Sequence, residues 1–362
     1  MIVDSSRNPR PTPTIKDVAD EAKVSRATVS RAFGQPHLLS RETVERVHAI
    51  AKRLGYVPNH MAQALSTGRA GNIALVVPDI INPFFAAIMR SAQTKALAQG
   101  YATFLGDADE TPDIEDVLLT KLSAQVEGFI LASSRLPKEC ILKHARRRPL
   151  VLINCDVAPL PRLLIDAAAS YGRAVEHLVS LGHRSIAYVA GPTRSWSDHQ
   201  RHKAVAKAAQ QFGIRTVRIE TSRPSFEGGQ GCTPALIDAK VTAALAFDDV
   251  TAQGIMAGLA GCDLSVPADF SLVGCDDVGA TTIYPPMTSI RINCADVGEQ
   301  AVNLLVNVLA GKEPRVKRLY VPTELIIRAT TAPPPGRPRR GAASSSSRQP
   351  SPPPSAPEPA KA

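Results

Sequence analysis

The feature that most constrains the fold is a long stretch, residues 72–330, in which short apolar runs alternate with amphipathic helical patterns. Segments 84–99 and 171–181 have the spacing of helices. The apolar runs are 73–77, 102–105, 128–131, 150–153, 186–189, 243–247 and 270–274. Such alternation is typical of parallel α/β sheets. Two sets of these units predict two lobes, with a ligand in the cleft between them at the carboxyl ends of the strands.

The N-terminal segment 14–59 has a different pattern, with three short helical stretches separated by turn residues. Thr14 is placed to cap the first helix, with Asp17 three residues later. Ser25 and Ser40 are placed to cap the second and third. Two short helices with a tight turn, the second rich in small polar residues and arginine, are typical of a helix-turn-helix. A plain three-helix bundle is the alternative.

Positive charge is confined to the two ends of the chain. Residues 1–71 carry 11 Lys and Arg against 6 Asp and Glu, and residues 331–362 carry 5 against 1. The stretch 72–330 is neutral, with 26 of each sign. A basic excess on a small segment suits phosphate binding, so the N-terminal helices are predicted to bind DNA.

The two termini have the composition of unfolded segments. Residues 1–13 are polar and contain no apolar signal segment, which predicts a disordered arm on a cytoplasmic protein. Residues 331–362 are rich in Pro, Ser and Ala and predict a disordered basic tail. No apolar run approaches the ~18 residues that span a bilayer, so no membrane partner is expected.

No pattern in the chain predicts catalysis, a cofactor or a metal. Nucleophile-elbow, Walker and dinucleotide-binding motifs are missing. The six cysteines lack zinc-site spacing and are predicted to be reduced and mostly buried. Asp198, His199 and His202 are near one another, but nothing adjacent in the sequence completes a set of metal ligands.

Several collinear segments resemble the LacI/GalR-type, or lactose-repressor, family of transcriptional regulators. These segments are 14–31, 54–59, 177–184, 190–192, 273–277 and 285–289. The resemblance implies an all-α helix-turn-helix headpiece followed by a two-lobed, periplasmic-binding-protein-like α/β core. It also implies a repressor of carbohydrate-related genes that binds a pseudo-palindromic operator in double-stranded DNA as a homodimer. A small-molecule effector, a sugar or sugar derivative, would control it.

The resemblance also assigns residues to DNA. Arg26 and Ala27 stand where the family selects its operator, and Arg31 is a second candidate base reader. Ser30 is also expected to face the major groove of the DNA. Residues suited to phosphates are Thr14, Ser25, Thr28, Ser40, Thr43 and Tyr56.

Segment 60–71 is expected to be a hinge, with a short helix from His60 to Ser66. In the family, this helix places a leucine in the minor groove of the operator. Leu65 occupies that position, with Ala62 beside it and Asn59 leading in.

By the same resemblance, effector contacts come from both lobes. The expected residues are Asp79, Asn82, Phe84, Asn154, Trp196, Arg201, Asp248 and Asp276. Trp196, the only tryptophan, would cover the apolar face of a sugar ring, with a surface or core position as the alternative. Asp248 replaces a usual asparagine and argues against an anionic effector.

Two other functions stay open. One is a cytosolic sugar-binding module whose N-terminal segment does not bind DNA. The other is an architectural DNA-binding protein that responds to no ligand. The basic N-terminal segment argues against the first, and the polar residues expected in the cleft argue against the second.

Overall fold

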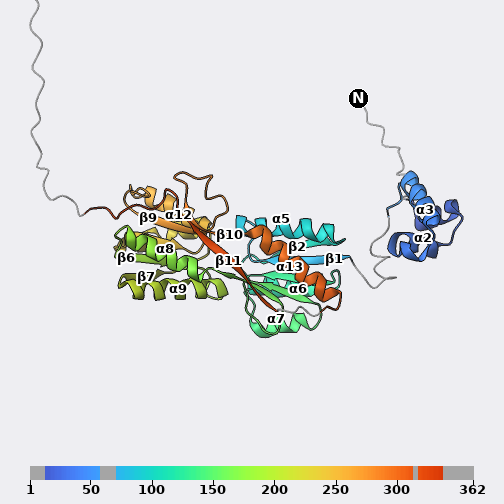
Figure 1. Cartoon of the computed structure of the whole chain (residues 1–362), viewed down its shortest axis with the longest axis horizontal. Coiled ribbons are helices and arrows are strands. Elements are labelled where there is room, and N and C mark those ends of the chain that lie inside the picture. Colours follow the sequence, from blue (N-terminus) through green and yellow to red (C-terminus); the bar gives the residue numbers. More distant parts are fainter. Residues whose placement is uncertain (1–12, 58–70, 313–316, 337–362) are drawn as a thin grey trace, which may run out of the picture.

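The computed structural model describes residues 13–57, 71–312 and 317–336. The predicted hinge helix, with Asn59, Ala62 and Leu65, lies outside the described residues. The headpiece has three α-helices and a short 3₁₀ turn, which are α1 Ile15–Ala22, α2 Arg26–Gly34, η1 Pro36–Leu38 and α3 Arg41–Leu54 (Figure 1). All three predicted α-helices are thereby confirmed.

The headpiece helices begin where short-range polar contacts dictate. The backbone N–H and hydroxyl of Thr14 both donate to the carboxylate of Asp17, at 2.7 Å each. Ser25 accepts from the N–H of Thr28 at 3.0 Å, and Ser40 accepts from that of Thr43 at 3.3 Å. These contacts satisfy N–H groups that a helix leaves open in its first turn. The helices enclose a small core of Val18, Ala19, Ala22, Val29, Ala32, Val47 and Ala51.

The first lobe is a five-stranded parallel sheet in the order β2-β1-β3-β4-β5. The strands are β1 Asn72–Val77, β2 Ala102–Asp107, β3 Gly128–Ala132, β4 Leu150–Ile153 and β5 Arg162–Asp166. Apolar side chains of two helices cover one face and those of two others cover the opposite face. The first pair is α5 Pro83–Ala98 and α13 Cys294–Leu309, and the second is α6 Pro112–Leu122 and α7 Lys138–Ala145.

The second lobe repeats this plan with the order β10-β9-β8-β6-β7, again parallel. Its strands are β6 Ser185–Val189, β7 Arg215–Ile219, β8 Ala243–Ala246, β9 Ser271–Asp276 and β10 Thr288–Ile292. Its helices are α8 Ala168–Ser180, α9 Trp196–Phe212, α10 Phe226–Gly231, α11 Thr233–Asp238 and α12 Asp249–Ala260. The central strands are buried along their whole length, as in sheets covered on both faces.

The chain passes between the lobes at three places. The first passage follows β5 into α8, and the second follows β10 into α13. The third is β11, Arg318–Ile326, which pairs parallel with β5 and then antiparallel with β10. One strand therefore joins the two sheets.

The structure confirms the two-lobed parallel α/β prediction and each predicted strand, while β5, β7, β10 and β11 were not predicted. The expectation that disorder begins at Thr331 is wrong for the first two residues of the tail. His177 Nε2 lies 2.9 Å from Thr331 Oγ1, and the N–H of Ala332 donates to Ser271 Oγ at 2.9 Å. All six cysteines are free, and four of them are buried. Within the described residues, no helix is long and apolar enough to cross a membrane.

Candidate functional site

A cavity lies between the two lobes, where several strands end. Its lining consists of Asn82, Phe84, Phe85, Glu110, Ser133, Arg135, Asn154, Ser197, Arg201, Pro224, Phe247, Asp248 and Asp276. The free space at its centre is about 20 Å³, room for about one water molecule. The cleft is therefore closed, and a larger ligand requires the lobes or the lining side chains to separate.

Backbone strain is concentrated at this cavity. Glu110, Ser133, Asn154 and Asp276 have φ angles of 56°, 46°, 52° and 109°, in the left-handed region that favours glycine. Each of the four lies at or just beyond the end of a strand. Left-handed non-glycine residues cost about 1–3 kcal/mol each and cluster at functional sites. The strained residues are thus the ones whose polar side chains line the cavity.

Arg201 and Asp276 form the polar centre of the cavity. Both are almost fully buried, and Arg201 Nη2 lies 3.7 Å from Asp276 Oδ1. Arg201 Nη1 donates to the carbonyl of Phe247, and its guanidinium carbon lies 4.7 Å from the centre of the Phe247 ring. Among the described residues, Arg201 Nε and Asp276 Oδ1 have no hydrogen-bond partner. A buried donor and a buried acceptor thus stay available to a ligand.

Carboxylates crowd the second-lobe side of the cavity. Asp248 caps α12 by accepting from the N–H of Thr251 at 2.8 Å. Burial raises the pKa of Asp248. Burial, together with the charges of Asp248 and Asp277, raises the pKa of Asp249 to about 7. Burial also raises that of Asp276, against the opposing effect of Arg201. Burial therefore favours the neutral form of both second-lobe carboxyl groups that line the cleft, Asp248 and Asp276.

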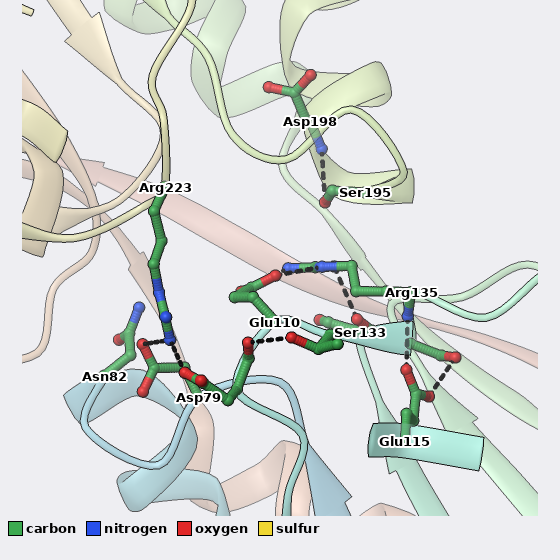
Figure 2. Close-up of polar contacts among 12 residues, drawn as sticks. Asp79, Asn82, Glu110, Glu115, Ser133, Arg135, Ser195, Asp198 and Arg223 are labelled. Atoms are coloured by element: carbon green, nitrogen blue, oxygen red, sulfur yellow. Dashed lines mark hydrogen bonds and ion pairs between the residues drawn. The ribbon is translucent and has the colours of Figure 1, made fainter. Parts of the chain in front are cut away.

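An ion pair shapes the first-lobe side. The Arg135 guanidinium holds both oxygens of Glu110, with Nε–Oε2 2.6 Å and Nη2–Oε1 3.0 Å (Figure 2). Its third nitrogen donates to the carbonyl of Ser133 at 2.7 Å. Buried Glu115 accepts from the N–H of Arg135 at 2.9 Å, which fixes the loop after β3. All three guanidinium nitrogens of Arg135 already donate to Glu110 or Ser133. Arg135 therefore fixes this side of the cavity and is less available as a donor to a ligand.

Polar contacts also bridge the two lobes at the cleft. The amide of Asn82 donates to Asp248 at 3.0 Å. Arg223 reaches from the loop after β7 to Asp109 at 2.6 Å and to Asp79 at 3.4 Å, the latter contact drawn in Figure 2. These contacts hold the closed arrangement.

Six of the eight expected effector residues line the cavity: Asn82, Phe84, Asn154, Arg201, Asp248 and Asp276. Asp79 does not line it, because its carboxylate accepts from the N–H of Ile81 and pairs with Arg223. Trp196 also lies elsewhere, in a separate cavity near Tyr320. The expectation that Trp196 covers a ligand in the cleft does not fit this position, and Phe84, Phe85 and Phe247 supply the aromatic walls.

Sequence reasoning missed several lining residues, which are Phe85, Glu110, Ser133, Arg135, Ser197, Pro224 and Phe247. A usable signal existed for some of them. Ser133 and Phe247 stand at the ends of predicted strand runs, where ligand contacts are expected. Pro224 and Ser197 carry no such signal, because the loop after β7 and the face of α9 are positioned by packing.

In the headpiece, the expected base readers Arg26, Ala27 and Arg31 are exposed on α2. Within the described residues, neither guanidinium is in an ion pair, so both are free to reach a base edge. The expected phosphate contacts Thr14, Ser25, Ser40, Thr28 and Thr43 lie in the first turns of the three helices. Such N–H-rich ends suit phosphates. Ser30 lies half-buried on α2, and the ring of Tyr56 packs against that of Phe33.

Two family models match the chain. Residues 14–59 match the bacterial regulatory proteins of the lacI family, and residues 175–331 match a periplasmic binding protein-like domain. The HTH-type transcriptional repressor CytR of Escherichia coli K12 is 33% identical over 88% of this chain and 96% of its own length. The ribose operon repressor of Halalkalibacterium halodurans is 30% identical over 88% and 97%.

Solved structures agree with these relatives. A lac repressor dimer bound to operator and an anti-inducer has a TM-score of 0.79 at 27% identity, covering 89% of this chain and 99% of that chain. A LacI family regulator of Enterococcus faecium with bound ribose has a TM-score of 0.67 at 28% identity, covering 72% and 99%. The relatives are transcriptional repressors, which confirms the prediction of a regulator and not an enzyme. The chain belongs to the lacI family of bacterial regulatory proteins.

Proposed function

We propose that this protein is a repressor of carbohydrate-related genes, acting in the cytoplasm, that an effector bound in the interlobe cleft switches between DNA affinities. The observation that carries the proposal is a pair of buried atoms, Arg201 Nε and Asp276 Oδ1, that have no hydrogen-bond partner among the described residues. They lie in a closed cleft of a chain that also carries a helix-turn-helix.

The effector class follows from the two groups at the centre. Arg201 offers a donor and Asp276 an acceptor, and Nη2 of the first lies 3.7 Å from Oδ1 of the second. Neighbouring hydroxyls of one small molecule can accept from the first and donate to the second. The rings of Phe84, Phe85 and Phe247 then cover the apolar face of that molecule. A sugar or sugar derivative meets both requirements.

Switching would proceed as a shift between closed and open arrangements of the lobes. The closed form has room for about one water molecule at the centre of the cleft. The hydrogen bond that Asn82 donates to Asp248 joins the two lobes in this form. A sugar that binds one arrangement better shifts the population towards it. We propose that segment 60–71 carries this shift to the headpiece, with Leu65 inserting into the minor groove.

A dimer supplies the two headpieces that a pseudo-palindromic operator requires. Two exposed apolar side chains support an interface near α5. Ile81, just before the helix, is 84% exposed, and Leu97, in its last turn, is 73% exposed. We expect sedimentation of the full chain to give a dimer, and Leu97→Glu to shift it towards the monomer.

The proposal is tested with DNA selected by the full-length protein from a random pool. Fluorescence anisotropy measures affinity for that DNA with and without a panel of sugars, polyols and sugar acids. A sugar is expected to change the affinity, and to raise the unfolding temperature of the protein by binding the folded state. Asp276→Asn should abolish both effects, while Asp263→Asn, in the turn after α12 and away from the cavity lining, should preserve them.

Two results would contradict the proposal. Selection of no DNA, together with a retained sugar response, supports a sugar-binding module. DNA binding that no ligand of the panel alters, with no thermal shift, supports an architectural protein.

A further inference from the structure

A second cavity lies beside the crossover strands, outside the cleft. Its volume is about 320 Å³, and its lining is Asp156, Ile165, Asp166, Ala167, Ala168, Trp196, Gln200, Arg318 and Tyr320. None of these residues lines the closed cleft. The volume is in the range of small-molecule sites.

The walls of this cavity come from both lobes. Trp196 and Gln200 lie one turn apart in α9 of the second lobe. Asp166 ends β5 of the first lobe, and Arg318 and Tyr320 belong to β11, the strand that joins the two sheets. A molecule held here would therefore touch both lobes beside β11, the strand that joins their sheets.

Two aromatic rings without full cover define its shape. Tyr320 is 54% exposed although it lies in a strand, and Trp196 is half-buried. The indole N–H of Trp196 has no hydrogen-bond partner among the described residues. The floor is apolar, formed by Ile165 and Ala167. Aromatic walls above an apolar floor favour a flat ring.

The edge of the cavity carries both hydrogen-bond donors and hydrogen-bond acceptors. Asp166 Oδ1 accepts from the N–H of Ala168 at 3.3 Å, which leaves its second oxygen as an acceptor. The amide of Gln200 offers both donor and acceptor. Arg318 pairs with Asp156 at 2.6 Å, and its guanidinium carbon lies 5.2 Å from the centre of the Tyr320 ring. Because a cation already occupies this position, a cationic ligand is disfavoured.

We propose that this cavity, which we name the hinge pocket, binds a flat neutral heterocycle with both N–H donors and acceptors on its edge, such as a free nucleobase. Trp196 and Tyr320 stack on the ring, while Asp166 and Gln200 bind its edge. This inference goes beyond the proposed function and does not depend on the effector of the cleft.

Trp196 makes the test direct, because it is the only tryptophan of the chain. The full-length protein is titrated with adenine, cytosine and uracil while the tryptophan emission is recorded. We expect one of these bases to change the emission with saturation. Tyr320→Ala should weaken that binding about tenfold, as the loss of one stacking ring does. Gln200→Ala, a milder change on the helix surface, should also weaken it.

The matched control is Phe212→Ala, which removes a partly exposed ring at the other end of α9. It should leave the titration unchanged. A response to glucose or ribose and to none of the bases overturns the ligand class. A response that Asp276→Asn abolishes and Tyr320→Ala spares places the ligand in the cleft and overturns the site. Absence of any saturable change at millimolar base overturns the proposal as a whole.

Discussion

The headpiece and the cleft use polar side chains in opposite ways. In the headpiece, the contacts that set the helices join residues three positions apart, and Arg26 and Arg31 stay exposed. In the cleft, Asn82 meets Asp248 across 166 positions, and Arg201 and Asp276 are buried. The contacts that stabilise the headpiece helices therefore leave its exposed arginines unused, whereas in the cleft the polar side chains themselves take part in the buried packing.

The largest expected effect follows from removing Arg201. Arg201→Ala leaves Asp276 buried without its nearest cation, which should lower the free energy of unfolding of the core by about 3–5 kcal/mol. Urea unfolding of the full chain measures this value. The matched change in the headpiece, Arg26→Ala, should stay within about 0.5 kcal/mol of the parent. Equal losses from the two variants would erase the contrast between the regions.

The two regions should also differ in their response to pH. Asp249 has a pKa raised to about 7, so its stabilising contribution is complete below about pH 4 and is lost as pH rises through 7. The slope is at most about 1.4 kcal/mol per pH unit. Asp17 has a pKa lowered by its hydrogen bonds from Thr14. Its contribution is therefore present above about pH 4 and lost on acidification.

Thermal unfolding between pH 2 and pH 8 checks this contrast, with the headpiece and core transitions followed separately. Asp248→Asn removes a charge that raises the pKa of Asp249. The pKa of Asp249 should therefore fall below 7 in the variant, and the loss of stability should end at a lower pH than in the parent. A core transition that is independent of pH over this range contradicts the prediction.

Base readout is the next effect in size. Arg26→Ala should cost roughly 1–3 kcal/mol of DNA affinity at one base position, with no change in the unfolding of the core. Selection from a randomised DNA pool, compared for parent and variant, shows which position is relaxed. Lys16→Ala on the exposed side of α1 is the control, and any weakening by it should be uniform across sequences. An unchanged base preference of the Arg26 variant would rule out this arginine as a reader.

The smallest effect is expected at the rim of the cleft. Arg223 is 37% exposed at its side chain and pairs with Asp109, which is 63% exposed. Arg223→Ala should therefore lower the free energy of unfolding by less than about 1 kcal/mol, because solvent screens the pair. The same urea unfolding measures it. A loss as large as that of Arg201→Ala would show that the closing contacts, and not the buried centre, hold the lobes together.

How far the sequence predicts each region follows from the same contrast. The headpiece helices were predictable, since Thr14, Ser25 and Ser40 cap helices through residues three positions away. In the core, buried strands such as β8 appear as continuous apolar runs. β7 did not, because it lies at the edge of its sheet and carries Arg215, Thr216 and Arg218.

The resemblance to the family located Asn154 and Asp276, and both lie at or just beyond the end of a strand, where ligand contacts are expected. Trp196 shows the limit of that reasoning. It lies five positions before Arg201, but those positions turn it to another face of α9 and into the hinge pocket. Which face of a helix meets the cleft is set by packing against distant strands, and a local pattern does not encode it.

Strand β11 has a consequence for how the protein is made. It adds one strand to the sheet of each lobe, yet it comes from residues 318–326, near the end of the chain. During synthesis on the ribosome, the edges of β5 and β10 therefore stay open until residues 318–326 have emerged. Loss of the last fifty residues would leave both lobes unfinished, although it removes neither the headpiece nor any residue that lines the cleft.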